Sequence, residues 1–463
     1  MHLKNEILQH HQILSDKNVL LLNSFAARIK EKKYEINLKD DSVPSFLQSY
    51  KYPLSPWPII ISKDRKREFS KIARLFPKLI TKCILSYFKN DLSRFEEIYS
   101  QPQVLYHLIE GMQEIMEKSF LRYDLLFFNN QIKLVEINAG TTCGGWQPSR
   151  LNHLYNKILK EDAISRDWNL KHVNPLEAMF KNVTQCIQQH LTKELTGNIL
   201  LISSGTYDSN NIGFWNELID IFNTVKPEGY PRIQLFLDET GKDLSVDQDG
   251  IVSYKGHELD AILDNARVNV NYRELTLSHI RSKLFFPDNP ITVLIGNKIN
   301  FYLLTQFINS PELSDEEKQL IKDYIPWTAL MGETQNVCWK GMRKDLKTIL
   351  VENKRSFLIK KAFSAEGTDV HIGKFISTDE WETIIEEKFE EEGWIAQEYF
   401  EPDTIYSLSQ QDIKEHSVIW GVFASGNNYT GSWIRLSELR DDFDGVINSA
   451  RGAKETIVYE EFS

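Results

Sequence analysis

Two neighbouring segments carry acidic and amide side chains at a spacing that suits a metal ion. Arg122 and Asp124 lie two residues apart, and Glu136 and Asn138 follow beyond Asn129–Gln131, a segment typical of a hairpin turn. Because side chains alternate along a strand, Glu136 and Asn138 share a face, and strand pairing would bring Asp124 to the same end. Such oxygen ligands suit Mg²⁺ beside phosphates, with Arg122 as an adjacent cation. The alternative is an ordinary hairpin with a solvated face.

A second segment, much later in the chain, could bind phosphate. Residues 357–373 are typical of two strands joined by a turn of small residues, with Lys360 on the first strand and Gly367 in the turn. A strand lysine and the backbone N–H groups of a hairpin can together hold phosphate oxygens. The segment has no GxxxxGK[ST] pattern, so it is not a P-loop. A surface hairpin with solvated lysines is the alternative.

Two further positions could complete a nucleotide site. Residues 394–400 form an apolar strand with a polar end, and the peptide groups around Gln397, Glu398 and Tyr399 could hydrogen-bond an adenine edge. Arg435 lies on a strand after a hairpin turn, where it could anchor a phosphate or a carboxylate. Taken alone, the first feature equally suits a partly buried edge strand, and an exposed arginine is the usual meaning of the second.

Together these segments resemble the ATP-grasp ligases, and in particular the circularly permuted branch that includes glutathionylspermidine synthase. Arg-x-Asp124 followed by Glu136-Ile-Asn138-Ala resembles the RFD…EYNAD metal-binding hairpin of that family. Residues 358–370, LIKKAFSAEGTDV, are similar to its VKKPIFGREGANV nucleotide hairpin. The match continues with Ile395–Tyr399 for the YVYQEL hinge, Ile434-Arg435 for the IRE strand, and the segment around Lys298 for the other nucleotide lysine.

The order of these motifs along the chain indicates the branch. In an unpermuted ATP-grasp enzyme the lysine segments come before the ExN motif, whereas here Glu136 and Asn138 precede Lys298 and Lys360. The chain also departs from the family pattern in the nucleotide hairpin, where Lys361, Ser364 and Ala365 replace Pro, Gly and Arg. After ExN, residues 139–146 read AGTTCGGW in place of Ala-Asp-Thr-Pro, so the substrate need not be glutathione.

The resemblance implies an ATP-dependent carboxylate–amine ligase that forms an amide through an acyl phosphate and releases ADP and phosphate. It implies Mg²⁺ bound by Asp124, Glu136 and Asn138. It further implies ATP held by Lys298, Lys360, Gly367, Gln397, Glu398 and Tyr399, and Arg122 and Arg435 as catalytic residues. The alternatives are a phosphotransferase that yields a stable phosphorylated product, and a nucleotide-binding protein without ligase activity.

The surrounding elements must position these residues. Residues 1–120 are predicted to be mostly helical, over Glu68–Phe88 and Val104–Phe120, before the hairpin of Tyr123–Phe128 and Ile132–Ile137. A Rossmann-like layer is predicted over about 197–297. Its strands are Ile199–Ile202, Ile233–Leu237, Ala261–Leu263 and Thr292–Ile295, with a helix at Phe214–Phe222. Strands at Phe357–Ile359, Trp394–Glu398 and Val418–Phe423 and a helix at Glu380–Glu392 follow.

The predicted fold class is therefore a multidomain mixture of α+β and α/β. By resemblance it is an ATP-grasp fold in circularly permuted order, with a Rossmann-like domain and an antiparallel nucleotide-binding sheet with a mobile lid. Four regions are expected: 1–195, with the helices and the metal-binding hairpin; 196–300, Rossmann-like and substrate-binding; 301–400, the lid and nucleotide-binding subdomain; and 401–463, the remainder of the catalytic domain.

Composition limits the partners. The 463 residues include 54 basic and 65 acidic side chains, a net charge of −11, which argues against a general nucleic-acid binder. The apolar runs are too short to span a membrane, and the four cysteines are scattered, as in a cytoplasmic protein with reduced thiols. The expected partners are small-molecule carboxylates and amines, and the protein could be a homodimer.

Overall fold

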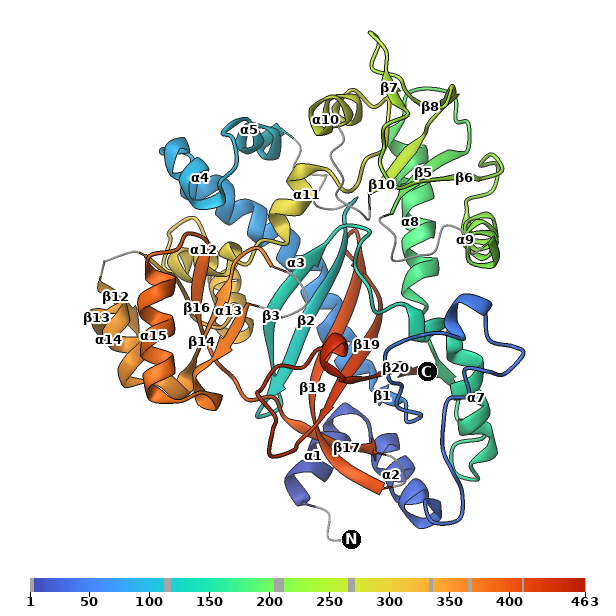
Figure 1. The fold of residues 1–463 in the computed structure, drawn as a ribbon, viewed down its shortest axis with the longest axis vertical. Coiled ribbons are helices and arrows are strands. Elements are labelled where there is room, and N and C mark those ends of the chain that lie inside the picture. Colours follow the sequence, from blue (N-terminus) through green and yellow to red (C-terminus); the bar gives the residue numbers. More distant parts are fainter. Residues whose placement is uncertain are drawn as a thin grey trace.

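The computed structural model describes residues 4–111, 118–203, 212–264, 271–332, 336–364, 369–409 and 412–462. At its centre lies a mixed sheet in the order β1-β20-β19-β18-β2-β3, with β17 added to β18 and β4 added to β20 (Figure 1). The strands are β1 (Ile59–Ile61), β2 (Phe120–Phe128), β3 (Gln131–Ala139), β4 (Leu170–Lys171), β17 (Thr404–Ser409), β18 (Asp412–Ser425), β19 (Asn428–Glu438) and β20 (Lys454–Glu461). Strands β1 and β20 run parallel, and the other pairs are antiparallel. The early β2–β3 hairpin therefore completes a sheet whose other long strands come from the end of the sequence.

The predicted hairpin is confirmed, with a tighter turn than expected. Phe128 pairs with Gln131, so only Asn129 and Asn130 form the loop, and their φ angles are 50° and 62°. Asparagine tolerates this left-handed region, and two such residues in succession are typical of a type I′ turn. The carboxylate of Asp403 accepts both of their backbone N–H groups, at 2.9 and 2.7 Å.

A β-bulge interrupts the hairpin at the point where the polar residues begin. Asp124 pairs with Glu136 but Leu125 pairs with Leu134, which leaves Val135 as the extra residue of β3. A bulge re-aims the residues that follow it. Two cross-strand pairs, Asp124 with Glu136 and Arg122 with Asn138, therefore lie on the same face of the hairpin. This common face is the one that the alternation of side chains in the sequence predicts.

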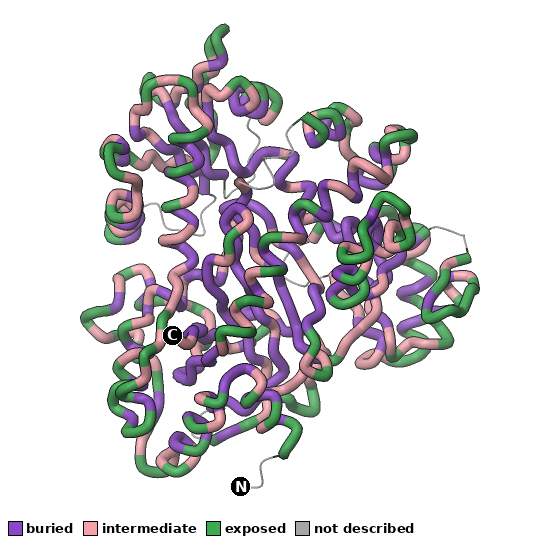
Figure 2. The backbone as a smooth tube through the Cα atoms, turned by 180° about the vertical axis from the view of Figure 1, so that it is seen from behind, coloured by how far each residue is buried: buried purple, intermediate pink, exposed green. Residues whose placement is uncertain are grey.

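Helices cover the central sheet. The long α3 (Lys63–Phe88) packs against β18, β19 and β20, and it begins at Ser62, whose side chain accepts the N–H of Arg65. Figure 2 shows the buried strands behind helices whose outer sides are exposed. The other helices before residue 200 are α1 (Asn5–Leu14), α2 (Asp16–Arg28), α4 (Leu92–Tyr99), α5 (Val104–Gly111), α7 (Asn152–Glu161) and α8 (Pro175–His190). The predicted helix over Val104–Phe120 is wrong at its end, because Phe120 begins β2, and residues 112–117 lie outside the described part.

A small parallel sheet of three strands lies in the region where the Rossmann-like layer is predicted. Its order is β10-β5-β6, and the antiparallel group β7-β8-β9 lies near it (Figure 1, upper right). The elements are β5 (Asn198–Ile202), α9 (Ile212–Val225), β6 (Gln234–Asp238), β7 (Leu244–Val246), β8 (Val252–Tyr254), β9 (His257–Glu258), β10 (Ala261–Asp264) and α10 (Tyr272–Ile280).

The predicted strand at Thr292–Ile295 is wrong, because this segment is helical, in α11 (Pro290–Ile295). The side chain of Asn289 accepts the N–H groups of Ile291 and Thr292, at 3.0 and 3.2 Å, and Pro290 occupies the first helical position. A capping asparagine followed by proline is a helix start signal. It outweighs the β-branched composition that suggested a strand.

A separate antiparallel sheet, β11-β16-β14-β15, lies beside the central sheet (Figure 1, left), and we call it the lid sheet. One of its faces packs on α14, α15 and the β12–β13 hairpin through Trp339, Phe357 and Trp381. The elements are α12 (Ile299–Phe307), α13 (Asp315–Tyr324), β11 (Thr328–Leu330), β12 (Asn336–Trp339), β13 (Met342–Asp345), α14 (Leu346–Glu352), β14 (Phe357–Lys361), β15 (Val370–Ile372), α15 (Thr378–Phe389) and β16 (Trp394–Glu398). The strands predicted here are confirmed.

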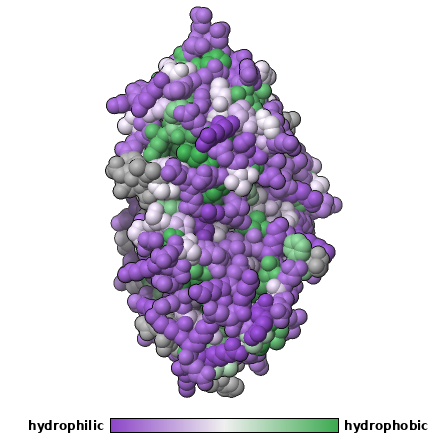
Figure 3. Space-filling model, turned by 90° about the vertical axis from the view of Figure 1, so that its right-hand side faces the viewer, coloured by the Kyte–Doolittle hydropathy of each residue, from purple (hydrophilic) through white to green (hydrophobic). Residues whose placement is uncertain are grey.

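The surface is mostly hydrophilic on the face that Figure 3 shows, with smaller hydrophobic patches. Among the described residues, no helix is both long and apolar enough to cross a bilayer. The architecture is thus a mixed α+β fold with a central mixed sheet, a small parallel sheet and an antiparallel lid sheet.

Candidate functional site

A cavity of about 200 Å³ lies between the central sheet and the lid sheet. Strands β2, β3 and β19 form one wall, and β14 and β16 form another. Ten of the eleven site residues predicted from the sequence line it: Arg122, Asp124, Glu136, Asn138, Lys298, Lys360, Gln397, Glu398, Tyr399 and Arg435. The eleventh, Gly367, lies outside the described residues. The two groups of motifs thus face one space, although they are far apart in the sequence.

Asp124 joins two arginines on the floor of this cavity. Arg122 donates from Nε and Nη2 to the two carboxylate oxygens, at 2.7 and 3.1 Å, and Arg435 Nη2 donates to Oδ2 at 2.6 Å. Both guanidinium groups also lie over the ring of Trp433, at 5.4 and 4.9 Å from its centroid. Burial opposes ionisation of Asp124, but the two cations outweigh it and hold its pKa below the ordinary value. Ion pairs to both of its oxygens fix the positions of the arginines.

The two lysines make different contacts. Lys298 Nζ lies 3.0 Å from Glu136 Oε1 and donates to the carbonyl oxygen of Ser364 at 3.0 Å. Lys360 is buried, and its Nζ donates to the carbonyl oxygen of Val135 at 2.8 Å and to Gln397 Oε1 at 2.9 Å. Val135, which accepts the first of these bonds, is the extra residue of the β-bulge. The bulge in β3 therefore takes part in the contact with the lid sheet.

The environment of Lys360 disfavours its charge. Burial lowers its pKa to about 7, and the neighbouring ammonium group of Lys298 acts in the same direction, while Glu136 and Asp124 act in the opposite one. An anionic ligand would restore the charge of this lysine. Such a perturbed group in a cavity is typical of a functional site.

Three buried polar atoms of residues that line the cavity have no hydrogen-bond partner among the described residues, namely Asn138 Nδ2, Tyr399 Oη and Arg435 Nε. Asn138 lies opposite Arg122 in the hairpin register. Buried polar atoms are almost always satisfied, so such atoms beside a cavity are suited to a polar ligand.

The donor set suits Mg²⁺ in part. Glu136 and Asn138 offer a carboxylate and an amide on one face, and 30% of the Glu136 side chain is exposed, so a bound cation could reach it. Asp124 already accepts from two arginines, so it would have to share its oxygens with the ion. Among the residues with described positions, no group of three or more His, Cys, Asp or Glu side chains could hold a metal. The predicted set contains only two such side chains.

The predicted adenine contacts need revision. The N–H of Glu398 donates to the carbonyl oxygen of Trp327, and that of Tyr399 to the carbonyl oxygen of Ser356, both at 2.8 Å. The Glu398 carboxylate pairs with Lys340 Nζ at 2.7 Å. Both N–H groups are therefore already engaged in hydrogen bonds within the protein. An adenine base would have to donate to backbone carbonyl oxygens of this segment, each of which can accept a second bond.

Several residues at the site carry no sequence signal. Thr328 accepts from Gln397 Nε2 at 3.1 Å and so orients the amide that binds Lys360. The carbonyl oxygen of Gly144 accepts from Arg122 Nη1 at 2.9 Å. Apolar side chains from both walls, including Leu358, Ile372 and Ile447, line the same cavity. These contacts depend on the three-dimensional arrangement and follow no local motif.

Comparisons with known proteins add little. No family model matches the chain, and no curated protein matches it. One solved structure that is similar to the model is that of a protein from Methylobacillus flagellatus KT, entitled "Putative gamma-glutamylcysteine synthetase". The identity is 11%, the TM-score is 0.40, and the match covers 82% of this chain and 88% of that one. A likeness of this size carries no argument about fold or function.

Proposed function

We propose that this protein is an ATP-dependent carboxylate–amine ligase, with an ATP-grasp fold in circularly permuted order. The observation that carries the proposal is the meeting of separate motifs. Five segments chosen for their chemistry, around residues 124, 137, 298, 360 and 435, line one cavity together with the end of β16. Segments without a common function would not be expected to line the same cavity.

The charge of the cavity supports a phosphate-rich ligand. Four cationic side chains, Arg122, Arg435, Lys298 and Lys360, line the cavity with the three carboxylates of Asp124, Glu136 and Glu398. Glu398 already pairs with Lys340 outside the lining, so cations outnumber the remaining carboxylates in a protein of net charge −11. Lys298 and Lys360 would bind phosphate oxygens, and a phosphate that reached Lys360 would favour its charged form. The apolar residues lining the cavity would contact the adenine ring.

Glu136 and Asn138 would hold Mg²⁺, and Asp124 would do so only by sharing its oxygens. Bound Mg·ATP supplies the phosphoryl group that converts a carboxylate into an activated acyl group. Arg122 and Arg435 would steady the anionic oxygens of the transferring group, because Asp124 already holds both guanidinium groups in place. The lid sheet would cover the nucleotide and exclude water.

The deciding experiment is a screen for ADP release by the purified protein against a matrix of acids and amines. ADP and phosphate should appear only when an acid and an amine are both present. Release of AMP would contradict the mechanism, and a stable phosphorylated product without condensation would indicate a phosphotransferase instead.

Variants connect the activity to the cavity. Glu136→Ala should abolish ADP release. Glu382→Ala, which removes an exposed acidic side chain of α15, should leave it unchanged. Unchanged turnover in Glu136→Ala would refute the assignment of the site.

A further inference from the structure

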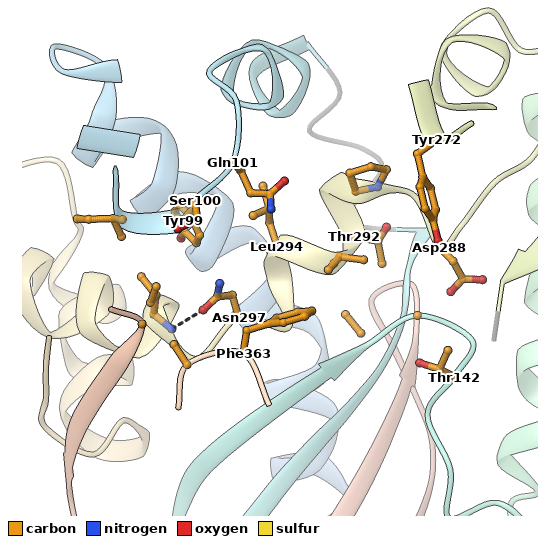
Figure 4. A pocket seen from close by; sticks show the side chains of 18 of the residues that line it. Tyr99, Ser100, Gln101, Thr142, Tyr272, Asp288, Thr292, Leu294, Asn297 and Phe363 are labelled. Atoms are coloured by element: carbon orange, nitrogen blue, oxygen red, sulfur yellow. Dashed lines mark hydrogen bonds between the residues drawn. The ribbon is translucent and has the colours of Figure 1, made fainter. Parts of the chain in front are cut away.

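A second cavity, of about 430 Å³, lies next to the nucleotide cavity. Figure 4 shows that its walls come from the segment after α4, from α11, and from the loop that follows β3. Tyr99, Ser100 and Gln101 lie on one side, Thr142, Tyr272 and Asp288 on the other, and Phe363 below. The volume is within the range of small-molecule sites.

At two places, consecutive residues of one strand line different cavities. Asn138 lines the nucleotide cavity and Ala139 the second one, and Lys360 and Lys361 are divided in the same way. Consecutive Cα atoms are only about 3.8 Å apart. The second cavity is therefore adjacent to the first, with the ends of β3 and β14 as their shared boundary.

One end of the second cavity is acidic. Asp288 is buried, with 7% of its surface exposed, and its carboxylate accepts from Thr141 N and Thr141 Oγ1 at 2.6 Å and from Asp264 N at 2.9 Å. Asp264 also lines the cavity and accepts from the Tyr272 hydroxyl at 2.6 Å. No ion pair of Asp288 occurs among the described residues. A buried carboxylate without a cation is costly, and a cationic ligand would offset that cost.

The rest of the lining is largely apolar. Ile98, Val293, Leu294 and Ile299 contribute aliphatic surface, and the ring of Phe363 is 53% exposed. An exposed phenylalanine at a cavity is suited to cover the apolar part of a ligand. The one cation among the described lining residues, Lys361, has its ammonium group 6.0 Å from the centroid of the Trp394 ring, which is not part of the lining.

The backbone holds the acidic end close to the metal-binding hairpin. Gly140 has a φ of 101°, and a Cβ at this position would lie 2.5 Å from Asp288 Oδ1. Gly140 is two residues beyond Asn138, and two extended residues span at most about 7 Å. Only glycine allows the carboxylate to approach the backbone this closely.

We propose that the second cavity binds the acceptor amine, as an ammonium ion carried on an apolar body, with Asp288 holding the ammonium group. The role as acceptor site rests on the proposed ligase function, but the binding does not. The ligand class follows from a buried carboxylate at one end, apolar walls, and a position next to the nucleotide cavity.

The test is calorimetric binding of hexylamine, 1-hexanol and hexanoate to the full chain without nucleotide. Hexylamine should bind at least about tenfold more tightly than hexanol, since tenfold corresponds to about 1.4 kcal/mol and one desolvated charge pair can supply that. Hexanoate should bind most weakly. Equal binding of the three compounds, or preference for hexanoate, would overturn the proposal.

Variants locate the binding. Asp288→Asn should remove the preference for hexylamine over hexanol. Because this change also disturbs three hydrogen bonds, Val293→Lys provides a second test. It places an ammonium group in a half-buried wall and should reduce hexylamine binding at least about tenfold by charge repulsion. Phe363→Ala should weaken hexylamine and hexanol alike, whereas Phe462→Ala, with the same 53% exposure but outside the cavity, should change neither.

Nucleotide binding separates this proposal from the proposed function. Lys360→Met should weaken ATP binding by at least about tenfold and leave hexylamine binding intact. Hexylamine binding without amine-dependent ADP release in any acid mixture would refute the ligase and leave the amine site standing. ADP release that responds to amines but not to Val293→Lys or Phe363→Ala would refute the amine site alone.

Discussion

Lys360 of the lid sheet donates a hydrogen bond of 2.8 Å to the carbonyl oxygen of Val135, the bulged residue of β3. The bond joins two sheets through residues 225 positions apart. It places the one strongly perturbed lysine of the cavity directly beside Glu136, the acidic residue that we assign to Mg²⁺. Under the proposed function, phosphate binding would be coupled to the position of the lid sheet through the ammonium group of Lys360.

Replacing this lysine tests that coupling. Lys360→Met should weaken ATP binding by at least about tenfold, because it removes a charge-assisted contact with phosphate and the link to β3. Lys361→Met is the matched control, since the neighbouring side chain is exposed and does not line the nucleotide cavity. Isothermal titration calorimetry with Mg·ATP measures both. Equal loss in the two variants would contradict the assignment.

The pKa of Lys360 predicts a pH dependence. With a pKa of about 7 in the free protein, this lysine is mostly neutral at pH 8. Phosphate favours the charged form and raises the pKa, so binding takes up a proton above pH 7, and affinity falls as pH rises from 6 to 8. Calorimetry in buffers of different ionisation enthalpy counts the protons. The comparison with Lys360→Met removes the titration of ATP itself, and an identical proton count in both proteins would refute the prediction.

The two carboxylates of the site should differ in their effect on stability. Asp124→Asn leaves Arg122 and Arg435 buried without their counter-ion, and should lower the free energy of unfolding by about 3–5 kcal/mol. Glu136→Gln should cost at most about 1 kcal/mol, because 30% of its side chain is exposed, yet it should remove the dependence of ATP binding on Mg²⁺. Urea unfolding followed by fluorescence measures the first effect. A similar stability loss in both variants would contradict the described cluster.

Gly140 tests the geometry between the two cavities. Gly140→Ala meets Asp288 Oδ1 at 2.5 Å in a backbone conformation with φ of 101°, so it should cost about 1–3 kcal/mol of stability and weaken hexylamine binding. Gly256→Ala is the control, because its φ is 80° but no atom lies within 4 Å of the added Cβ. The difference in thermal unfolding between the two variants isolates the contact. No difference would show that Asp288 moves freely.

The sequence predicts the strands of the site well, because alternation and turn residues are local signals. Asn129 and Asn130 indicate the turn directly, and the spacing of Glu136 and Asn138 gives their common face. The strand predicted at Thr292–Ile295 failed because a capping asparagine and a proline, Asn289 and Pro290, decide the helix. The β-bulge at Val135 has no local signature, because it is defined only by pairing with β2.

The second cavity could not be predicted from sequence motifs. Its lining comes from segments that lie near residues 100, 140, 264, 290 and 362, and none of them carries a recognisable pattern. In the sequence, nothing distinguishes Asp288 from the other aspartates. Its burial and its closeness to Gly140 appear only in the structure. Tertiary packing creates this cavity, whereas the residues that line the first cavity could be singled out from their local spacing.

The central sheet has a consequence for biosynthesis. Strand β2 lies between β3 and β18, and β18 is translated almost 300 residues after β2. At about 5–20 residues per second, the ribosome needs roughly 15–60 s to make the missing neighbour. Throughout that interval β2 presents an unpaired edge that other chains could join. We therefore expect chaperones to hold the nascent chain until β18 emerges, and the arginine cluster around Asp124 to assemble only after β19 has followed.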